Sequence, residues 1–142
     1  MKIAGFNGRY RWLSNFAPCF ITGVDGRQYP SVEHAYQAAK LLPDDLEEFY
    51  LRVQTGMTAA GAKSFTRYKQ LKPDWLAARL NVMYTLVYRK FQLPLYRNKL
   101  LATGDAELVE DNWWNDTYWG VCNGRGENHL GKILMAVRDL VR

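Results

Sequence analysis

Three side chains that can do chemistry share one face of a predicted helix that begins after Ser31. Glu33, Gln37 and Lys40 follow one another at intervals of four and three residues, so a helix brings them to the same side. A carboxylate there can stabilise a positive charge or activate water, and a deprotonated amine can attack a carbonyl carbon. Charged residues at helical spacing more often form a solvated face, and a first-turn Glu33 also suits the helix dipole. Spacing alone favours the solvated face, and by type His34 is more often a hydrogen-bonded structural residue than an acid or base.

Residues 8–16, just before this helix, alternate basic, aromatic and amide side chains. Arg9 offers forked donors that suit a phosphate or a ribose, and Asn15 offers a directed amide. An exposed turn that places Trp12 and Phe16 in the core has the same composition. Both interpretations stay open.

The second candidate region is residues 111–128, where the helical periodicity disappears. This stretch combines four large aromatic side chains with amides, charges and three glycines. Irregular segments of this length are uncommon in compact domains and are often functional. We therefore expect a site here as well.

The elements that must position these residues are mostly helices. A hairpin is predicted over residues 19–29, because Asp25-Gly26 supplies the positive φ of a tight turn. Ser31 is a natural N-cap, and Pro43 and Pro94 suit first helical turns. Helices are expected over residues 32–41, 43–53, 58–65, from 73 to about 91, 94–101 and from about 130 to the C-terminus.

Apolar residues recur at helical spacing in the two longest predicted helices, which indicates faces that pack into a core. No repeat, low-complexity tract or flexible linker divides the chain. The sequence predicts an α+β fold in one compact domain, residues 1–142, mostly helical with a small N-terminal β-hairpin region. The apolar stripes are Leu76, Leu80, Met83, Val87 and Phe91, and Leu130, Ile133, Leu134, Val137, Leu140 and Val141.

Composition limits the class of protein. An apolar fraction of 48% argues against disorder, and no apolar run approaches the roughly 20 residues that span a bilayer. The first residues lack the pattern of a signal peptide, so we expect a soluble, cytoplasmic protein without a membrane partner. The net charge of +5 suggests an anionic partner such as a phosphate or nucleic acid.

Neither a metal nor a cofactor is expected. Cys19, Cys122, His34 and His129 do not have the spacing of zinc ligands. The glycines after residue 119 do not form a dinucleotide-binding fingerprint, because no clear strand precedes them and their spacing differs.

Several motifs recur in order along nearly the whole chain. They are Leu13-Ser14-Asn15-Phe16, Tyr29-Pro30-Ser31-Val32-Glu33-His34-Ala35-Tyr36-Gln37-Ala38-Ala39-Lys40, Lys72-Pro73-Asp74-Trp75, Tyr88-Arg89-Lys90-Phe91, Asn115-Asp116-Thr117-Tyr118-Trp119-Gly120 and Gly124-Arg125-Gly126-Glu127-Asn128-His129-Leu130-Gly131. Each motif alone is weak. Jointly they are specific, and the chain resembles the YbiA-like N-glycosidases, also called the NADAR family.

The resemblance implies a compact, mostly helical α+β fold and an enzyme that hydrolyses N-glycosidic bonds. The implied substrate is a ribosyl phosphate intermediate of riboflavin biosynthesis, or guanine that carries ADP-ribose, free or within nucleic acid. Glu33, Lys40 and Asp116 match the catalytic positions. The predicted substrate-binding residues are Arg9, Ser14, Asn15, Phe16, His34, Gln37, Trp119, Gly120 and Asn128.

Cleavage of a ribose–nitrogen bond develops positive charge on the sugar and negative charge on the departing nitrogen. Glu33 would stabilise the sugar or activate water, and Asp116 would help protonate the nitrogen, by analogy with O-glycoside hydrolysis. Lys40 could instead capture the aldehyde of an opened ribose as a Schiff base. The alternatives are a non-catalytic module that binds ADP-ribose or nucleic acid, and a purely structural protein.

Overall fold

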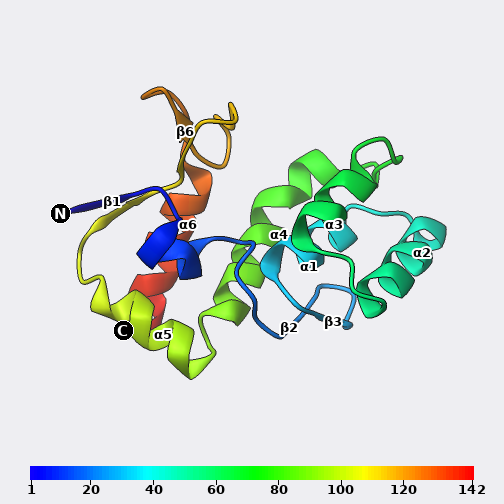
Figure 1. Ribbon diagram of the computed structural model, residues 1–142, viewed down its shortest axis with the longest axis horizontal. Helices are drawn as coiled ribbons and strands as arrows, with labels where there is room; N and C mark the ends of the chain where they lie inside the picture. Colours follow the sequence, from blue (N-terminus) through cyan, green and yellow to red (C-terminus); the bar gives the residue numbers. More distant parts are fainter. The chain divides into compact units, whose positions relative to one another are not determined.

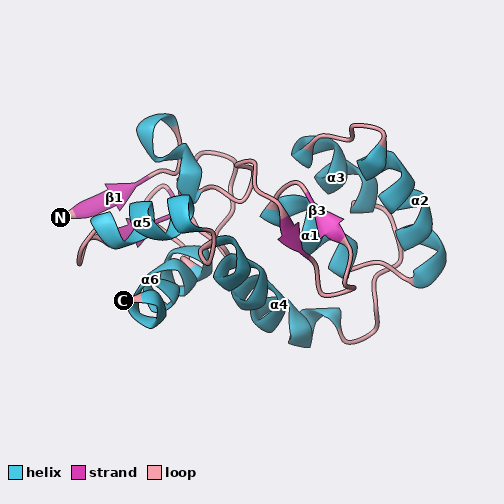
Figure 2. Cartoon of the chain, turned by 90° about the horizontal axis from the view of Figure 1, so that it is seen from below, coloured by secondary structure: helices cyan, strands magenta, loops and turns pink.

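The computed structural model describes all 142 residues, and the chain folds into two units (Figure 1). The central unit is residues 15–90, and the terminal unit joins residues 1–14 to residues 91–142. Helices dominate both units and the strands are short (Figure 2), so the predicted α+β class is confirmed. None of the helices is long and apolar enough to cross a membrane.

The central unit begins with the predicted hairpin. Strand β2 (Ile21–Thr22) pairs antiparallel with β3 (Gln28–Tyr29), and Gly26 takes a φ of +84° in the turn between them. Arg89, from the end of the long helix, donates through Nη1 to the carbonyls of Thr22 and Gly23 at 2.8 and 3.0 Å. The hairpin is therefore tied to the C-terminal end of the last helix of this unit.

Four helices complete the central unit, close to their predicted bounds. Ser31 and Thr58 cap two of them, accepting hydrogen bonds from the backbone N–H of His34 and of Gly61, both at 3.1 Å. Pro43 opens another. The helices are α1 (Val32–Ala39), α2 (Pro43–Gln54), α3 (Ala59–Thr66) and α4 (Trp75–Lys90).

The predicted apolar stripe of α4 is wrong in its first half. Leu76 and Leu80 are 73% and 38% exposed, whereas Trp75 is buried. The larger ring of Trp75 occupies the interior, and because neighbouring helical positions differ by about 100°, Leu76 turns outward. The second half of the stripe, from Met83 onward, is buried as predicted.

The terminal unit is built on a parallel strand pair between distant parts of the chain. Strand β1 (Lys2–Ala4) pairs with β4 (Glu107–Val109), and the apolar face of α6 (His129–Val141) packs on β4. Helix α5 (Pro94–Ala102) lies before β4 and packs on α6. Residues 8–13, part of the segment of alternating basic, aromatic and amide side chains, form the 3₁₀ helix η1 (Gly8–Leu13). Neither β4 nor η1 has a local sequence pattern strong enough to predict it.

Residues 111–128 are mostly irregular, as predicted. They contain one short parallel pair, β5 (Asp111–Asn112) with β6 (Val121–Cys122). Residues 113–120 connect the two strands, and we call them the aromatic loop.

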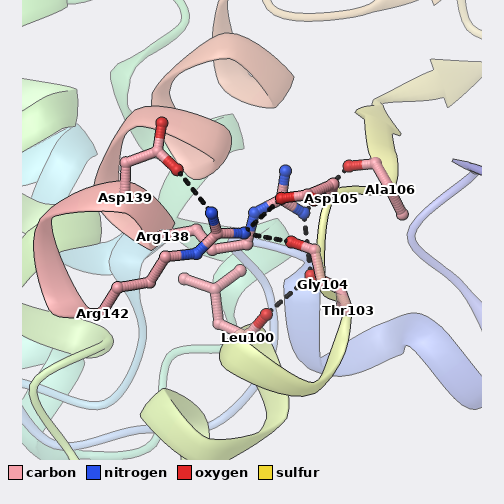
Figure 3. A network of polar contacts seen from close by, with 8 residues as sticks. All are labelled: Leu100, Thr103, Gly104, Asp105, Ala106, Arg138, Asp139 and Arg142. Atoms are coloured by element: carbon pink, nitrogen blue, oxygen red, sulfur yellow. Dashed lines mark hydrogen bonds and ion pairs between the residues drawn. The ribbon is translucent and has the colours of Figure 1, made fainter.

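The last helix is attached to the turn after α5 by two arginines (Figure 3). Arg138 donates through Nη1 to the Thr103 hydroxyl and to the Ala106 carbonyl, both at 2.9 Å. Arg142 contacts Asp105 at 2.8 Å. These bonds hold the segment that leads into β4 against the end of α6.

Lys90, the last residue of α4, is only 1% exposed. Burial lowers the pKa of its ammonium to about 7, and the nearby Cys19 opposes that shift. An unfolded chain keeps this proton up to a pKa of about 10.4. Between these values the unfolded state binds more protons than the folded state, so stability rises with pH.

We expect Lys90→Met to remove this pH dependence. Between pH 7 and 9, the free energy of unfolding of the wild type should rise by about 2 kcal/mol relative to the variant, measured by urea unfolding at each pH. The range ends at pH 9 because the raised pKa of Cys19 lowers stability at higher pH. A constant difference across this range would show that Lys90 is protonated in the fold.

Candidate active site

Glu33 is buried in the central unit rather than solvated. It is 7% exposed and Gln37 is 3% exposed, and every residue of α1 is buried. Gln37 Nε2 donates to Glu33 Oε2 at 3.1 Å, and the Thr66 hydroxyl of α3 donates to Gln37 Oε1. The solvated face that spacing favours is therefore wrong. α1 presents a carboxylate that is held from one side by an oriented amide.

The backbone at the start of α1 is attached to the segment before the hairpin. The Glu33 N–H donates to the Asn15 carbonyl at 3.0 Å. The Asn15 side chain contacts Met83 Sδ of α4 through Nδ2 at 3.5 Å. Asn15 thus lies at the start of the helix that carries Glu33, and Phe16 follows it as a half-buried ring.

His34 is held at both ring nitrogens by protein groups. Nε2 lies 2.7 Å from the Met57 carbonyl, and Nδ1 lies 2.7 Å from the Ser31 hydroxyl. Because a carbonyl only accepts, Nε2 carries the proton, and burial lowers the pKa of the ring and favours this neutral form. His34 fixes the start of α1, and its predicted contact with substrate stays a prediction.

Lys40 ends α1 above two aromatic rings. Its Nζ lies 5.1 Å from the centroid of the Tyr36 ring and 6.0 Å from that of Trp75, and these two rings meet edge to face at 5.2 Å. The Lys40 carbonyl accepts from the Lys72 N–H at 2.9 Å. The amine and the backbone carbonyl of Lys40 are therefore both held in place, although the side chain remains half-exposed.

The environment of Lys40 lowers the pKa of its amine. Burial lowers its pKa, Glu33 opposes that shift, and the cations of Lys63 and Arg79 lower the pKa further. A neutral amine is the form that attacks carbon. The shift is thus in the direction that Schiff-base chemistry requires of Lys40.

Asp116 organises the aromatic loop of the terminal unit. Its Oδ1 accepts from the backbone N–H of Tyr118 at 3.1 Å and of Trp119 at 2.9 Å. The Asn112 side chain in turn bonds the backbone N–H and carbonyl of Asp116 at 3.0 and 2.9 Å. One carboxylate oxygen therefore has a structural role, which sequence reasoning did not anticipate.

Gly120 and Asn128 are also explained by backbone contacts. A Cβ on Gly120 would lie 2.1 Å from the Glu110 carbonyl, so only glycine allows this approach. Asn128 accepts from the Glu110 N–H and donates to the Leu108 carbonyl, both at 3.0 Å. Trp119 differs from both, because its half-buried ring, 4.9 Å from that of Tyr118, keeps part of its surface accessible.

The predicted residues of the first segment lie in and after η1. Arg9 is exposed, with its guanidinium 5.0 Å from the Tyr10 ring centroid. The Ser14 N–H donates to the Arg11 carbonyl at 2.9 Å and ends the 3₁₀ helix. The Trp12 ring contacts Phe91 edge to face at 6.3 Å. Trp12 therefore packs on its own unit, and Arg9 remains accessible.

The predicted residues divide between the two units. The central group is Asn15, Phe16, Glu33, His34, Gln37 and Lys40, and the terminal group is Arg9, Ser14, Asp116, Trp119, Gly120 and Asn128. Sequence reasoning assigned no role to Thr66, which holds Gln37, or to Trp75, which lies beside Lys40. The motif Lys72-Pro73-Asp74-Trp75 was the available signal for Trp75. Thr66 had none.

An open hollow of about 530 Å³ lies between the end of α2 and α3. Met57 connects it to the central group, since its carbonyl bonds His34. None of the predicted site residues lines the hollow, so it is distinct from the surroundings of Glu33. Its lining residues are Arg52, Thr55, Gly56, Met57, Gly61, Ser64 and Phe65.

A buried, hydrogen-bonded carboxylate close to an amine of lowered pKa is typical of an enzyme site. The family model of the NADAR domain matches residues 5–142, and the chain belongs to this family. The NMR structure of the Escherichia coli protein YbiA matches with a TM-score of 0.82 and 34% identity, covering 99% of this chain and 86% of that one. The predicted resemblance is confirmed.

Related proteins have two kinds of name, N-glycosidase and riboflavin biosynthesis protein. The N-glycosidase YbiA of Shigella boydii is 41% identical over 132 residues, which cover 92% of this chain and 81% of that protein. An N-glycosidase of Nostoc punctiforme is 36% identical, with 94% and 86% covered. A riboflavin biosynthesis protein of Vibrio vulnificus is 44% identical over 90% of this chain, which spans only 35% of that protein.

Two substitutions of Asp116 separate its structural role from its charge. Asp116→Ala removes the acceptor for two backbone N–H groups and should lower the free energy of unfolding by about 1–3 kcal/mol. Asp116→Asn keeps an acceptor oxygen and should cost less than about 1 kcal/mol. Urea unfolding of both variants measures the difference. Equal losses would mean that the loop does not depend on this acceptor.

Proposed function

We propose that this chain hydrolyses the bond between C1 of a ribose and a nitrogen, with Glu33 as the carboxylate at the sugar. The predicted class of activity, hydrolysis of an N-glycosyl bond, is confirmed by the N-glycosidase relatives. The observation that carries the assignment to Glu33 is its burial with Oε2 hydrogen-bonded to Gln37. The charge of this carboxylate also acts on the amine of Lys40.

Glu33 acts on the sugar as the bond to nitrogen breaks. Positive charge then develops at C1, and a carboxylate in a site of low dielectric stabilises it more strongly than one in water. Gln37 and Thr66 fix the carboxylate before the reaction, so little reorganisation is needed in the transition state. The same carboxylate can accept a proton from the attacking water.

The departing nitrogen needs a proton, and Asp116 is the proposed donor. Its Oδ1 accepts the backbone hydrogen bonds of the aromatic loop, and Oδ2 is the oxygen that would carry the proton. Trp119 supplies an accessible ring in the same loop, which can stack on a base. The proposed acid and the stacking surface thus lie in the same loop.

Lys40 offers a covalent route after the ribose ring opens. While the nitrogen is still attached, the opened ribose holds it at C1 as an imine. The neutral amine adds to C1, the departing nitrogen takes a proton and leaves as the Lys40 imine forms, and one water then hydrolyses that imine to the C1 aldehyde and the restored amine. Burial of the amine and the neighbouring cations favour the neutral state that this addition requires.

Two substrates fit this chemistry. One is a ribosyl phosphate intermediate of riboflavin biosynthesis, and the other is guanine that carries ADP-ribose, free or within nucleic acid. The alternative function is a non-catalytic module for ADP-ribose or nucleic acid. Trp113 and Trp114, 86% and 48% exposed, favour this alternative as a surface for stacking bases.

We expect Glu33→Gln to lower kcat/KM at least about 100-fold on the true substrate while the fold survives. The new amide oxygen still accepts from Gln37, so the thermal midpoint should change little. Release of ribose phosphate and of ADP-ribose from the two substrates is measured side by side. Glu107→Gln, at an exposed glutamate of the terminal unit, is the matched control.

Full activity of Glu33→Gln would contradict the role of this carboxylate. Release of neither product by the wild type, with ADP-ribose or nucleic acid still bound, would instead establish the non-catalytic module.

We expect borohydride to trap the sugar on Lys40 during turnover. Reduction of the imine leaves a stable amine, so mass spectrometry should find the adduct on the peptide that contains Lys40. Lys40→Ala should abolish it, whereas Lys99→Ala, at an exposed lysine, should not. An unmodified wild type, or equal labelling of Lys40→Ala, would count against the covalent route.

A further inference from the structure

Two tryptophans stand exposed at the tip of the aromatic loop. Trp113 is 86% exposed and Trp114 is 48% exposed, whereas the other aromatic rings of the loop are half-buried. The two rings meet edge to face, with centroids 5.6 Å apart and an angle of 87° between their planes. Adjacent large rings in solvent often mark a surface for a partner. Neither ring takes part in the proposed hydrolysis.

Side-chain hydrogen bonds hold this tip in place. Asn112 Oδ1 accepts from the Asp116 N–H at 3.0 Å, and Asn112 Nδ2 donates to the Asp116 carbonyl at 2.9 Å. The two bonds join the residues on either side of residues 113–115 and close a small loop, which we call the tryptophan tip. At its apex Asn115 takes a φ of +68°, a conformation that asparagine adopts more readily than most residues. A surface held in this way loses little entropy when a partner binds.

The surroundings of the tryptophan tip are negative, although the whole chain carries a net charge of +5. Residues 107–129 contain five carboxylates and one arginine. Asp111 and Asp116 flank the tip in the chain, and the Glu127 N–H donates to the Thr117 carbonyl of the same loop at 2.8 Å. Asp111 is exposed and forms no ion pair. The tip therefore combines accessible aromatic faces with negative charge.

This combination suits a cation better than an anion. The face of a tryptophan ring attracts a guanidinium or ammonium group, and carboxylates beside it add ionic attraction. Arginine forms such contacts more often than lysine, and its planar group also pairs with a carboxylate. A nucleic acid can stack its bases on the same rings, but its phosphates would meet the carboxylates.

We propose that the tryptophan tip is a docking surface for an arginine-rich segment of a partner protein. The charge of the tip selects this class of partner, and the two rings supply the contact area. The proposal is independent of the hydrolysis assigned to Glu33, because none of its steps requires turnover.

Nuclear magnetic resonance of the intact, nitrogen-15-labelled protein tests the docking surface. The five tryptophans give five indole N–H signals, so each ring can be followed separately. We expect a hexa-arginine peptide to shift the signals of Trp113 and Trp114 and to leave that of the buried Trp75 in place. A hexa-glutamate peptide should shift none of them.

Single substitutions divide the interaction between ring and charge. Trp113→Ala should weaken binding of the hexa-arginine peptide about two- to fivefold, as for loss of an exposed cation–π contact. Asp111→Asn should weaken it about twofold, with a smaller effect at high salt. Both residues are exposed, so the fold should be retained. Phe20→Ala and Asp44→Asn remove an exposed ring and an exposed carboxylate of the central unit and should leave the affinity unchanged.

Unmoved signals of Trp113 and Trp114, or an unchanged affinity of Trp113→Ala, would overturn the docking surface. Equal shifts with an oligothymidine would assign the tip to nucleic acid instead of a basic protein segment. Shifts that grow with protein concentration alone would assign it to a second copy of this chain. Either result would also overturn the arginine-rich partner.

Discussion

The hydrogen-bonded chain from Thr66 through Gln37 to Glu33 is the constraint on which the candidate site depends. A buried carboxylate is unfavourable unless polar groups compensate it, and the Gln37 amide does so while facing α3. The rest of the central unit holds α1 in place for that contact. Ser31 caps the helix, His34 fixes its first turn, and the Asn15 carbonyl accepts from the Glu33 backbone. The contacts that bury α1 therefore also orient the carboxylate.

The aromatic loop follows a different principle, in which polar side chains replace regular hydrogen-bond ladders. Asn112 and Asp116 bond backbone groups within the loop, and Asn128 does the same for the strand beside it. Such bonds satisfy backbone groups that an irregular segment would otherwise bury without a hydrogen-bond partner. Family motifs in this region therefore contain residues whose identity is explained by loop geometry, alongside Trp119, whose ring remains accessible.

Local signals in the sequence were sufficient for most helices and for the hairpin. Caps such as Ser31, the turn glycine Gly26 and apolar periodicity act over a few residues, so they can be seen without the fold. Burial of Glu33 could not be predicted, because the same spacing on an isolated helix describes a solvated face, and α1 is buried only once the rest of the unit packs on it. The pairing of β1 with β4 joins residues about a hundred positions apart and has no local pattern. The convergence of Lys63 and Arg79 on Lys40 is likewise visible only once the helices are packed.

The parallel pairing of β1 with β4 also imposes an order of assembly during synthesis. The first strand leaves the ribosome long before its partner, whereas Asn15, Gln37, Thr66 and Trp75 all emerge within one continuous stretch. Contacts between residues close in the chain form sooner than those that close a long loop. The surroundings of Glu33 can therefore form while the nascent chain is still incomplete, and the N-terminal strand must wait unpaired until β4 appears.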